Sequence, residues 1–295
     1  MKYAALLTLL ALGGVTASQA TDLPPFAGQC AALDRVAAAA ANARTESIAI
    51  DSLEKIALGR AAGIGAEADA TLGMAAGTLE DKGFADPTAR ACALRSLGRT
   101  ALGGAIEFLT KLTPADLGSD PSQRLWPAAQ VALREAQLRG ITDTYLKTEF
   151  LDRTVTEHHD AVSNSAVTSW AVDELCDRGA QVSLPVIQQS IRSRRNGPRD
   201  EQEIEFCEAR IRVVASNPDR AKALASVLTA GGDATNTRLA GWAVNALNSM
   251  QTPAADAELD RFAREIEKLP EGSPTKAHLD IYRQEIMEFR GQRVK

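Results

Sequence analysis

The sequence predicts an all-α protein, and three observations support that prediction. Alanine, the strongest helix former and a weak strand former, makes up 53 of the 295 residues. A short apolar pattern recurs along the chain at an almost constant spacing. Proline follows a helix-capping side chain at several points where a helix would begin. Together these features indicate helical hairpins stacked one after another.

Composition argues against several other classes of protein. Apolar residues make up 45% of the chain and charged residues 24%, which suits a packed core rather than a disordered acidic segment. The 33 basic and 38 acidic side chains give a net charge of −5, without the basic excess typical of nucleic-acid-binding proteins. The chain holds only 7 Phe, 3 Trp and 3 Tyr. We therefore expect no nucleic-acid partner and a core of small and aliphatic side chains.

Residues 1–20 are predicted to be a secretory signal peptide. Lys2 precedes an apolar run over residues 4–15, and the small residues Ser18 and Ala20 suit cleavage. The run is too short to cross a hydrocarbon layer of about 30 Å, and no later segment is long enough. Cys30 lies too far on for a lipid anchor. We expect a periplasmic or secreted protein without a membrane span; the alternative is that this segment is the first helix of the fold.

Four cysteines fit an oxidising compartment. The local pairings, Cys30 with Cys92 and Cys176 with Cys207, are favoured, and buried free thiols are the alternative. The absence of a Cys-x-x-Cys motif argues against a thiol oxidoreductase or a four-cysteine zinc site.

The repeated pattern begins with a small or aromatic anchor residue, followed by Ala or Val and then by a large aliphatic residue. Anchors at positions 92, 128, 170, 206 and 242 follow one another at 36, 42, 36 and 36 residues. Each unit is predicted to be a first helix carrying the anchor, a turn and a second helix. The second helices are expected at about 104–112, 142–155, 184–194, 218–229 and 254–268, with a last helix over 274–290. The polar stretch 152–165 is expected to form a longer connection.

Five proline pairs supply a second marker of helix starts, because a capping oxygen and a proline suit the first turn of a helix. They are Asp86-Pro87, Asp120-Pro121, Asn217-Pro218, Thr252-Pro253 and Ser273-Pro274.

The cysteines also test the repeat geometry. Cys176 lies six residues after its anchor and Cys207 only one residue after its own. Five positions correspond to about 7.5 Å along a helix axis, whereas a disulfide needs Cα atoms about 5.5 Å apart. The pair can therefore form only if the two first helices are staggered.

Two units are especially alike: Trp170-Ala171-Val172 followed by Leu175, and Trp242-Ala243-Val244 followed by Leu247. With the period, this motif resembles HEAT-type repeats of the short bacterial variety over residues 86–270, in about five units. The resemblance implies a right-handed α-solenoid, commonly used as a binding surface, although some bacterial members are linked to chromophore lyases or modifying enzymes. Residues 21–85 are expected to form an N-terminal helical cap, or alternatively a flexible linker, and residues 271–295 a C-terminal capping helix.

One cluster contains side chains that bind metals, namely Glu157, His158, His159 and Asp160. Adjacent histidines on a helix point about 100° apart and need further ligands to complete a site. We therefore regard His158, His159 and Asp160 as weak metal candidates, favour a solvated connection between units, and assign no cofactor. His278 is expected at the surface.

The densest basic run is a candidate partner contact, because guanidinium groups bind carboxylates and phosphates. It consists of Arg192, Arg194, Arg195 and Arg199. Several acidic residues follow it at once, beginning with Asp200 and Glu201, so a neutralised loop between units is favoured.

No nucleotide-binding or nucleophile motif occurs. Trp170 and Trp242 are expected to be core anchors. The leading prediction is an exported, non-catalytic repeat protein that binds another protein through the surface of its second helices. The alternatives are a metal-dependent hydrolase or lyase that uses Glu157 to Asp160, and a periplasmic immunity or inhibitor protein.

Overall fold

The computed structural model describes residues 33, 37, 46–59, 87–120, 123–158, 165–194, 197–228, 234–250 and 252–293. These residues form helices and connecting turns and no strand, which confirms the all-α prediction. The predicted signal peptide and most of the predicted N-terminal cap lie outside the described residues. The elements are α3 (Glu46–Ala57), α5 (Pro87–Thr100), α6 (Gly103–Lys111), α7 (Leu125–Gly140), α8 (Thr144–His158), α9 (Ser165–Asp177), the 3-10 helix η2 (Gln181–Ser183), α10 (Leu184–Ser193), α11 (Pro198–Ala215), α12 (Arg220–Ala225), α13 (Ala234–Met250), α14 (Pro253–Glu267) and α15 (Pro274–Arg293).

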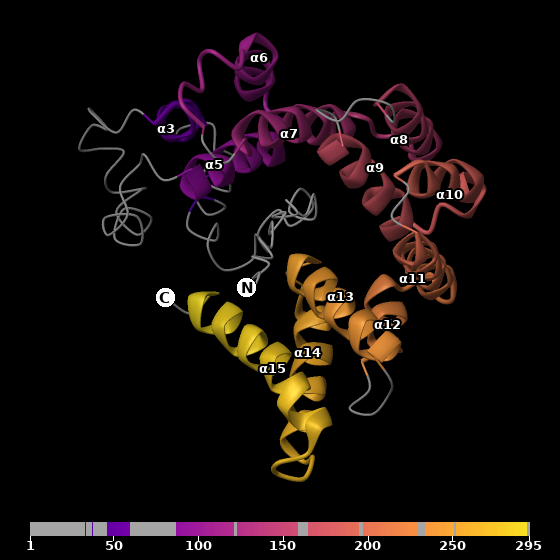
Figure 1. The fold of residues 1–295 in the computed structure, drawn as a ribbon. Helices are drawn as coiled ribbons and strands as arrows, with labels where there is room; N and C mark the ends of the chain where they lie inside the picture. The colour runs from indigo at the N-terminus through magenta and orange to yellow at the C-terminus, as the bar shows by residue number, and fades with distance from the viewer. Residues whose placement is uncertain are drawn as a thin grey trace, which may run out of the picture.

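The described helices follow one another along a curved arc (Figure 1). The odd-numbered helices from α3 to α15 form one row, in which each helix packs against the next odd-numbered helix. The even-numbered helices lie beside this row, and α8 packs against α10 and α12 against α14. All five predicted anchor positions, 92, 128, 170, 206 and 242, fall in odd-numbered helices of this one row.

Helices α9, α11 and α13 run parallel and are staggered. Asp177 contacts Arg210 across 33 positions, and Arg210 stacks on Trp242, a further 32 positions along the chain. The contacting residues are fewer positions apart than the anchors, which are 36 residues apart. Neighbouring helices are therefore shifted along their axes by about one turn relative to the anchors. The shift is the stagger that the disulfide requires, and the Cα atoms of Cys176 and Cys207 are 5.3 Å apart.

Alanine and glycine allow close contact between helices in the odd-numbered row. A Cβ atom at Gly98 of α5 would lie 2.4 Å from the carbonyl oxygen of Ala132 in α7, a separation that no side chain tolerates. At Gly241 of α13 the close neighbour is a side chain rather than backbone: a hypothetical Cβ would lie 2.5 Å from the phenol oxygen of Tyr282 in α15. The alanine-rich composition therefore reflects helices whose backbones touch, as well as helix propensity.

Helix α3, which falls in the predicted cap, shares a core with α5, α6 and α7. Arg90 of α5 is buried and donates to the carbonyl oxygen of Ala57 at 3.0 Å and to that of Leu117 at 2.6 Å. The guanidinium thereby satisfies the C-terminal end of α3, where the helix dipole favours a positive charge. Burial lowers the pKa of Arg90, while Asp120 opposes that effect.

Three of the five proline pairs mark helix starts, because α5, α14 and α15 begin at Pro87, Pro253 and Pro274. Of the other two, Pro121 lies outside the described residues, and Pro218 lies two residues before the start of α12. Helix α12 begins at Arg220 because the Asp219 carboxylate accepts from the backbone N–H groups of Ala221 and Lys222.

Helix α7 begins at Leu125, and the Asp120 carboxylate accepts from the backbone N–H of Leu125 at 2.7 Å. At α12 the capping residue, Asp219, is therefore not the one paired with the proline, whereas at α7 the paired Asp120 itself bonds to the first turn, five residues further on.

Two predicted connections differ from the structure. The polar stretch that begins at Asp152 is helical as far as His158, and the hydroxyl groups of Thr154 and Thr156 donate to the backbone carbonyls of Phe150 and Asp152, one turn earlier. The predicted second helix over 218–229 shortens to α12, Arg220–Ala225. Helices α6, α8, α10, α14 and α15 lie within a few residues of their predicted ranges.

We predict that Gly98→Ala lowers the free energy of unfolding by about 1–3 kcal/mol, because α5 and α7 must separate to admit the methyl group. The gain in helix propensity, about 1 kcal/mol, offsets only part of this cost. Gly140→Ala is the matched control, since no atom lies within 4 Å of its hypothetical Cβ. Urea unfolding of both variants measures the effect, and equal stabilities would refute the close contact.

Candidate functional site

A buried disulfide links α9 to α11. Cys176 and Cys207 are bonded, as their proximity in the sequence predicted, and both side chains are almost fully buried. Cys92 is also disulfide-bonded. The predicted pairing of Cys92 with Cys30 falls on a residue outside the described part of the chain. The bond between α9 and α11 holds the two helices together beside a polar cluster.

That cluster is built around Arg210, whose side chain is only 7% exposed. The guanidinium donates to the Asp173 carboxylate at 2.9 Å, to the Asp173 backbone carbonyl at 3.1 Å and to the Asp177 carboxylate through both Nε and Nη2. Burial by itself lowers the pKa of Arg210, but Asp177 and Asp173 raise it above the usual value. Arg210 is therefore a fixed, fully charged group.

Aromatic rings from two helices complete the cluster. The Arg210 guanidinium lies 5.4 Å from the ring centre of Phe206 and 5.6 Å from that of Trp242. The indole N–H of Trp242 donates to Asp177 at 2.6 Å. Arg238 of α13 stacks on Phe206 with its guanidinium carbon 3.9 Å from the ring centre. We call these six residues the Arg210 cluster: Asp173, Asp177, Phe206, Arg210, Arg238 and Trp242.

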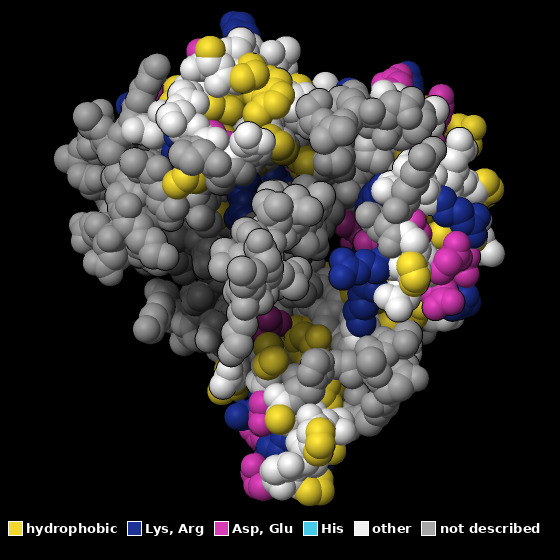
Figure 2. Space-filling view, viewed as in Figure 1, with side chains coloured by type: hydrophobic (Ala, Val, Ile, Leu, Met, Phe, Trp, Pro, Cys, Tyr) yellow, Lys and Arg dark blue, Asp and Glu magenta, His cyan; other side chains and the backbone are white. Residues whose placement is uncertain are grey.

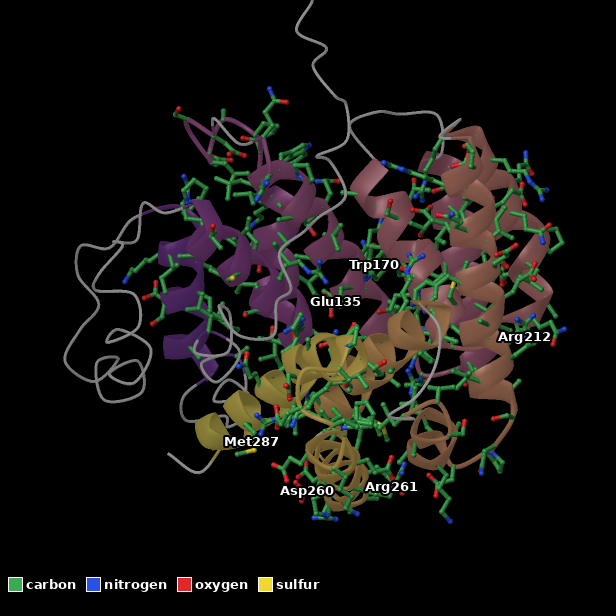
Figure 3. The ribbon with its side chains drawn as sticks, turned by 60° about the horizontal axis from the view of Figure 1, so that its bottom comes forward. Glu135, Trp170, Arg212, Asp260, Arg261 and Met287 are labelled. Carbon is green, nitrogen blue, oxygen red and sulfur yellow. A yellow bond between two sulfur atoms is a disulfide. The ribbon has the colours of Figure 1, made fainter. Side chains whose placement is uncertain are left out.

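A second charged group, on α5, α7 and α9, lies further back along the odd-numbered row. Glu135 is nearly buried, and three arginines approach its carboxylate: Arg95 at 3.1 Å, Arg139 at 3.4 Å and Arg99 at 3.7 Å. Glu135 of α7 and Trp170 of α9 lie toward the middle of the molecule, whereas Arg212 lies at its outer side (Figure 3).

Glu174 of α9 belongs to the same electrostatic environment. Burial raises the pKa of Glu174, while its ion pair with Arg178, at 3.0 Å, acts in the opposite direction. The negative charges of Asp177 and Glu135 raise the pKa further.

Large apolar side chains are exposed on α8 and on η2, the short helix just before α10. Tyr145 and Leu146, in the first turn of α8, are 76% and 51% exposed, and Val182 in η2 is 83% exposed. Ser183 lies beside Asp152, which places η2 against the middle of α8. Tyr145 is seven residues from Asp152 and so lies two turns away on the same side of that helix. We call Tyr145, Leu146 and Val182 the α8–α10 edge.

Backbone contacts hold both ends of this edge. The Asp143 carboxylate caps the first turn of α8 by accepting from the backbone N–H of Leu146 at 2.9 Å. Before η2, Gly179 adopts a positive φ of 68°, and its hypothetical Cβ would lie 3.1 Å from Val214 of α11. The exposed side chains therefore project from a fixed frame.

The predicted metal candidates receive no support from the described residues. Glu157 is exposed in the last turn of α8, and His158 ends that helix. His159 and Asp160 lie outside the described residues. Within the part of the chain that the structure describes, no group of three or more His, Cys, Asp or Glu side chains is placed to hold a metal ion.

The predicted basic run is largely neutralised where it is described. Arg192 pairs with Glu201 at 3.1 Å and Arg194 with Glu203 at 3.4 Å. Arg199 is exposed in the first turn of α11, and Arg195 lies outside the described residues. These ion pairs join α10 to α11, so the first two arginines have a structural role between helices.

Sequence reasoning did not find the Arg210 cluster or the α8–α10 edge. Trp242, predicted to be a core anchor, is only partly buried and uses its N–H group as a donor. The i, i+4 spacing of Asp173 and Asp177 was available as a signal, but such spacing is common on solvated helix faces. Only the stagger of α9 and α11 brings these acids to Arg210.

We predict that replacing both Cys176 and Cys207 with alanine lowers the free energy of unfolding by about 3–4 kcal/mol. The bond closes a loop with a sequence separation of 31, and the loss of that constraint stabilises the unfolded chain by this amount. Urea unfolding without reductant, after peptide mapping of the wild-type bond, measures the difference. A double variant as stable as the wild type would contradict the prediction.

We predict a pH dependence of stability from Glu174. Because its folded pKa is raised, the folded state binds the proton more tightly than the unfolded chain, for which the reference value is 4.5. The wild-type free energy of unfolding, relative to that of Glu174→Gln, should therefore fall as the pH rises from 4.5 through the folded pKa and then level off. Unfolding of both proteins between about pH 4 and pH 8 tests this, and parallel curves would exclude Glu174 as the source.

Comparison with protein-family models, with curated proteins and with solved structures finds no match to this chain. None of the described helices is long and apolar enough to cross a membrane. The features of the chain itself that bear on function are the Arg210 cluster on the odd-numbered helices and the α8–α10 edge beside them.

Proposed function

We propose that the chain is an exported, non-catalytic helical-repeat protein that binds a partner protein through the surface of its second helices, α6, α8, α10, α12 and α14. In this proposal the helices form a right-handed α-solenoid of HEAT-like units, and the α8–α10 edge is the main contact.

The helix contacts support the repeat architecture. Each odd-numbered helix packs on the next, and α9, α11 and α13 are parallel with nearly equal steps of 33 and 32 residues between contacting positions. A regular row of this kind presents the neighbouring helices as a continuous surface, where side chains can vary without changing the core.

The observation that carries the proposal is the α8–α10 edge. Aromatic and aliphatic side chains at these exposures gain free energy when a partner covers them, and tyrosine is enriched in protein interfaces. Three of the five large hydrophobic side chains that are exposed among the described residues belong to this edge. The capped first turn of α8 fixes the backbone from which Tyr145 projects, so that association does not have to order that backbone.

Export is supported by the disulfide between Cys176 and Cys207, because such bonds persist mainly in oxidising compartments. A protein in the periplasm or the medium meets other exported proteins, and we propose the partner among these.

We predict that Tyr145→Asp combined with Val182→Asp abolishes capture of the partner from an envelope extract and weakens binding of the isolated partner at least tenfold. The two substitutions remove apolar surface that the partner would bury, and the two new carboxylates would have to lose their water on binding. Affinity capture followed by calorimetry with the identified partner provides the measurement.

Gln202→Asp is the control and should leave capture unchanged, since it adds a negative charge at an exposed position of α11, outside the surface of the second helices. Helical circular dichroism and melting should be unchanged in all variants, because the replaced side chains are exposed. Equal capture by the double variant and the wild type would refute the α8–α10 edge as the binding surface.

A further inference from the structure

The Arg210 cluster contains an arginine, Arg238, that forms no ion pair with any carboxylate in the part of the chain that the structure describes. Arg238 is exposed and stacks on Phe206, with its guanidinium carbon 3.9 Å from the ring centre. No described carboxylate pairs with it. By comparison, the buried Arg210 of α11 is hydrogen-bonded to both Asp173 and Asp177.

The ring beneath Arg238 is fixed in position. Phe206 contacts Arg210, which is held by two carboxylates and a backbone carbonyl, and Trp242 is tied to the same Asp177. The disulfide of Cys207, one residue after Phe206, joins this turn of α11 to α9. Arg238 therefore lies on a rigid surface, and stacking restricts its side chain before any ligand arrives.

A guanidinium stacked on a ring uses its face for the ring and keeps the N–H donors at its own edge available to a ligand. That arrangement matches the two oxygens of a carboxylate, which can accept two parallel hydrogen bonds. Figure 2 shows Lys and Arg side chains between α11 and α13, on the side that faces the inside of the arc. We propose that Arg238, stacked on Phe206, is the anion-binding residue of a second ligand site that takes a carboxylate group of a peptide or protein.

The charges of the cluster favour a carboxylate over a phosphate. Two arginines and two aspartates make the cluster neutral, and the side chain of Asp173 remains 64% exposed. A singly charged carboxylate pairs with Arg238 at little cost, whereas a phosphate dianion brings a second negative charge toward Asp173. This site lies on α11 and α13, away from the α8–α10 edge, so either site can fail without the other.

The test uses the full chain labelled with nitrogen-15 and two small probes, N-acetyl-glutamate amide and inorganic phosphate. We expect saturable shifts of the Arg238 side-chain N–H and the Trp242 indole N–H on addition of the glutamate probe, with a dissociation constant in the millimolar range that suits one ion pair. The corresponding glutamine probe, which lacks the charge, should give no saturable shift.

Arg238→Gln should weaken binding of the glutamate probe about tenfold or more, as judged from the Trp242 signal. Arg238→Lys keeps the charge but loses the planar donors, so its affinity should lie between those of the wild type and Arg238→Gln. Arg212→Gln is the control, because Arg212 is an exposed arginine on the outer side of α11 beside Glu208, and its replacement should leave binding unchanged (Figure 3).

Equal affinity of wild type and Arg238→Gln would overturn the proposal, as would the absence of any saturable shift with the glutamate probe. Tighter binding of phosphate than of the glutamate probe would overturn the assignment of the ligand as a carboxylate. Because Arg238 is exposed, its variants should keep the wild-type circular dichroism spectrum, which separates loss of binding from loss of folding.

Discussion

The C-terminal half of the described fold depends on one buried guanidinium, that of Arg210, which joins three parallel helices. Arg210 of α11 donates to Asp173 and Asp177 of α9 and stacks against Trp242 of α13. A buried charge that lost these partners would be left without compensation, at a cost of about 3–5 kcal/mol. The row of helices adopts the axial shift between α9, α11 and α13 that lets Arg210 keep its hydrogen bonds. The same shift brings Cys176 and Cys207 within bonding distance.

The two rows of helices differ in how closely they pack and in how much of their surface is exposed. In the odd-numbered row, the backbones of α5 and α7 approach until a single added methyl group would collide, as at Gly98 against Ala132. Such contacts leave little freedom for the sequence to change. The even-numbered helices are freer to vary at their outer surface; the exposed Tyr145 lies on α8, and the exposed Val182 lies on η2 just before α10. Close packing on one side thus leaves the other side available for recognition.

How far the sequence anticipates the structure depends on the range of the interaction concerned. Local signals performed well: Pro87, Pro253 and Pro274 begin helices as predicted, and the anchors fall in helices of one row. They failed where a second cap competed, as when Asp219 took the first turn of α12. The pairing of Cys176 with Cys207 was predicted from proximity, but its geometry required a shift between helices that no local pattern records.

The amino-acid sequence by itself determined that the described chain is helical, where several of its helices begin, and which of its residues recur with a common period. These properties depend on contacts within a few turns of one helix, and alanine, proline and capping side chains encode them directly. Only the tertiary structure decided the offset between helices. That offset brought Asp177, Arg210 and Trp242 together from positions 65 residues apart, left Arg238 exposed on Phe206, and placed η2 against α8. Long-range contacts of this kind follow from how side chains of different helices fit, which the spacing of residues along one chain does not specify.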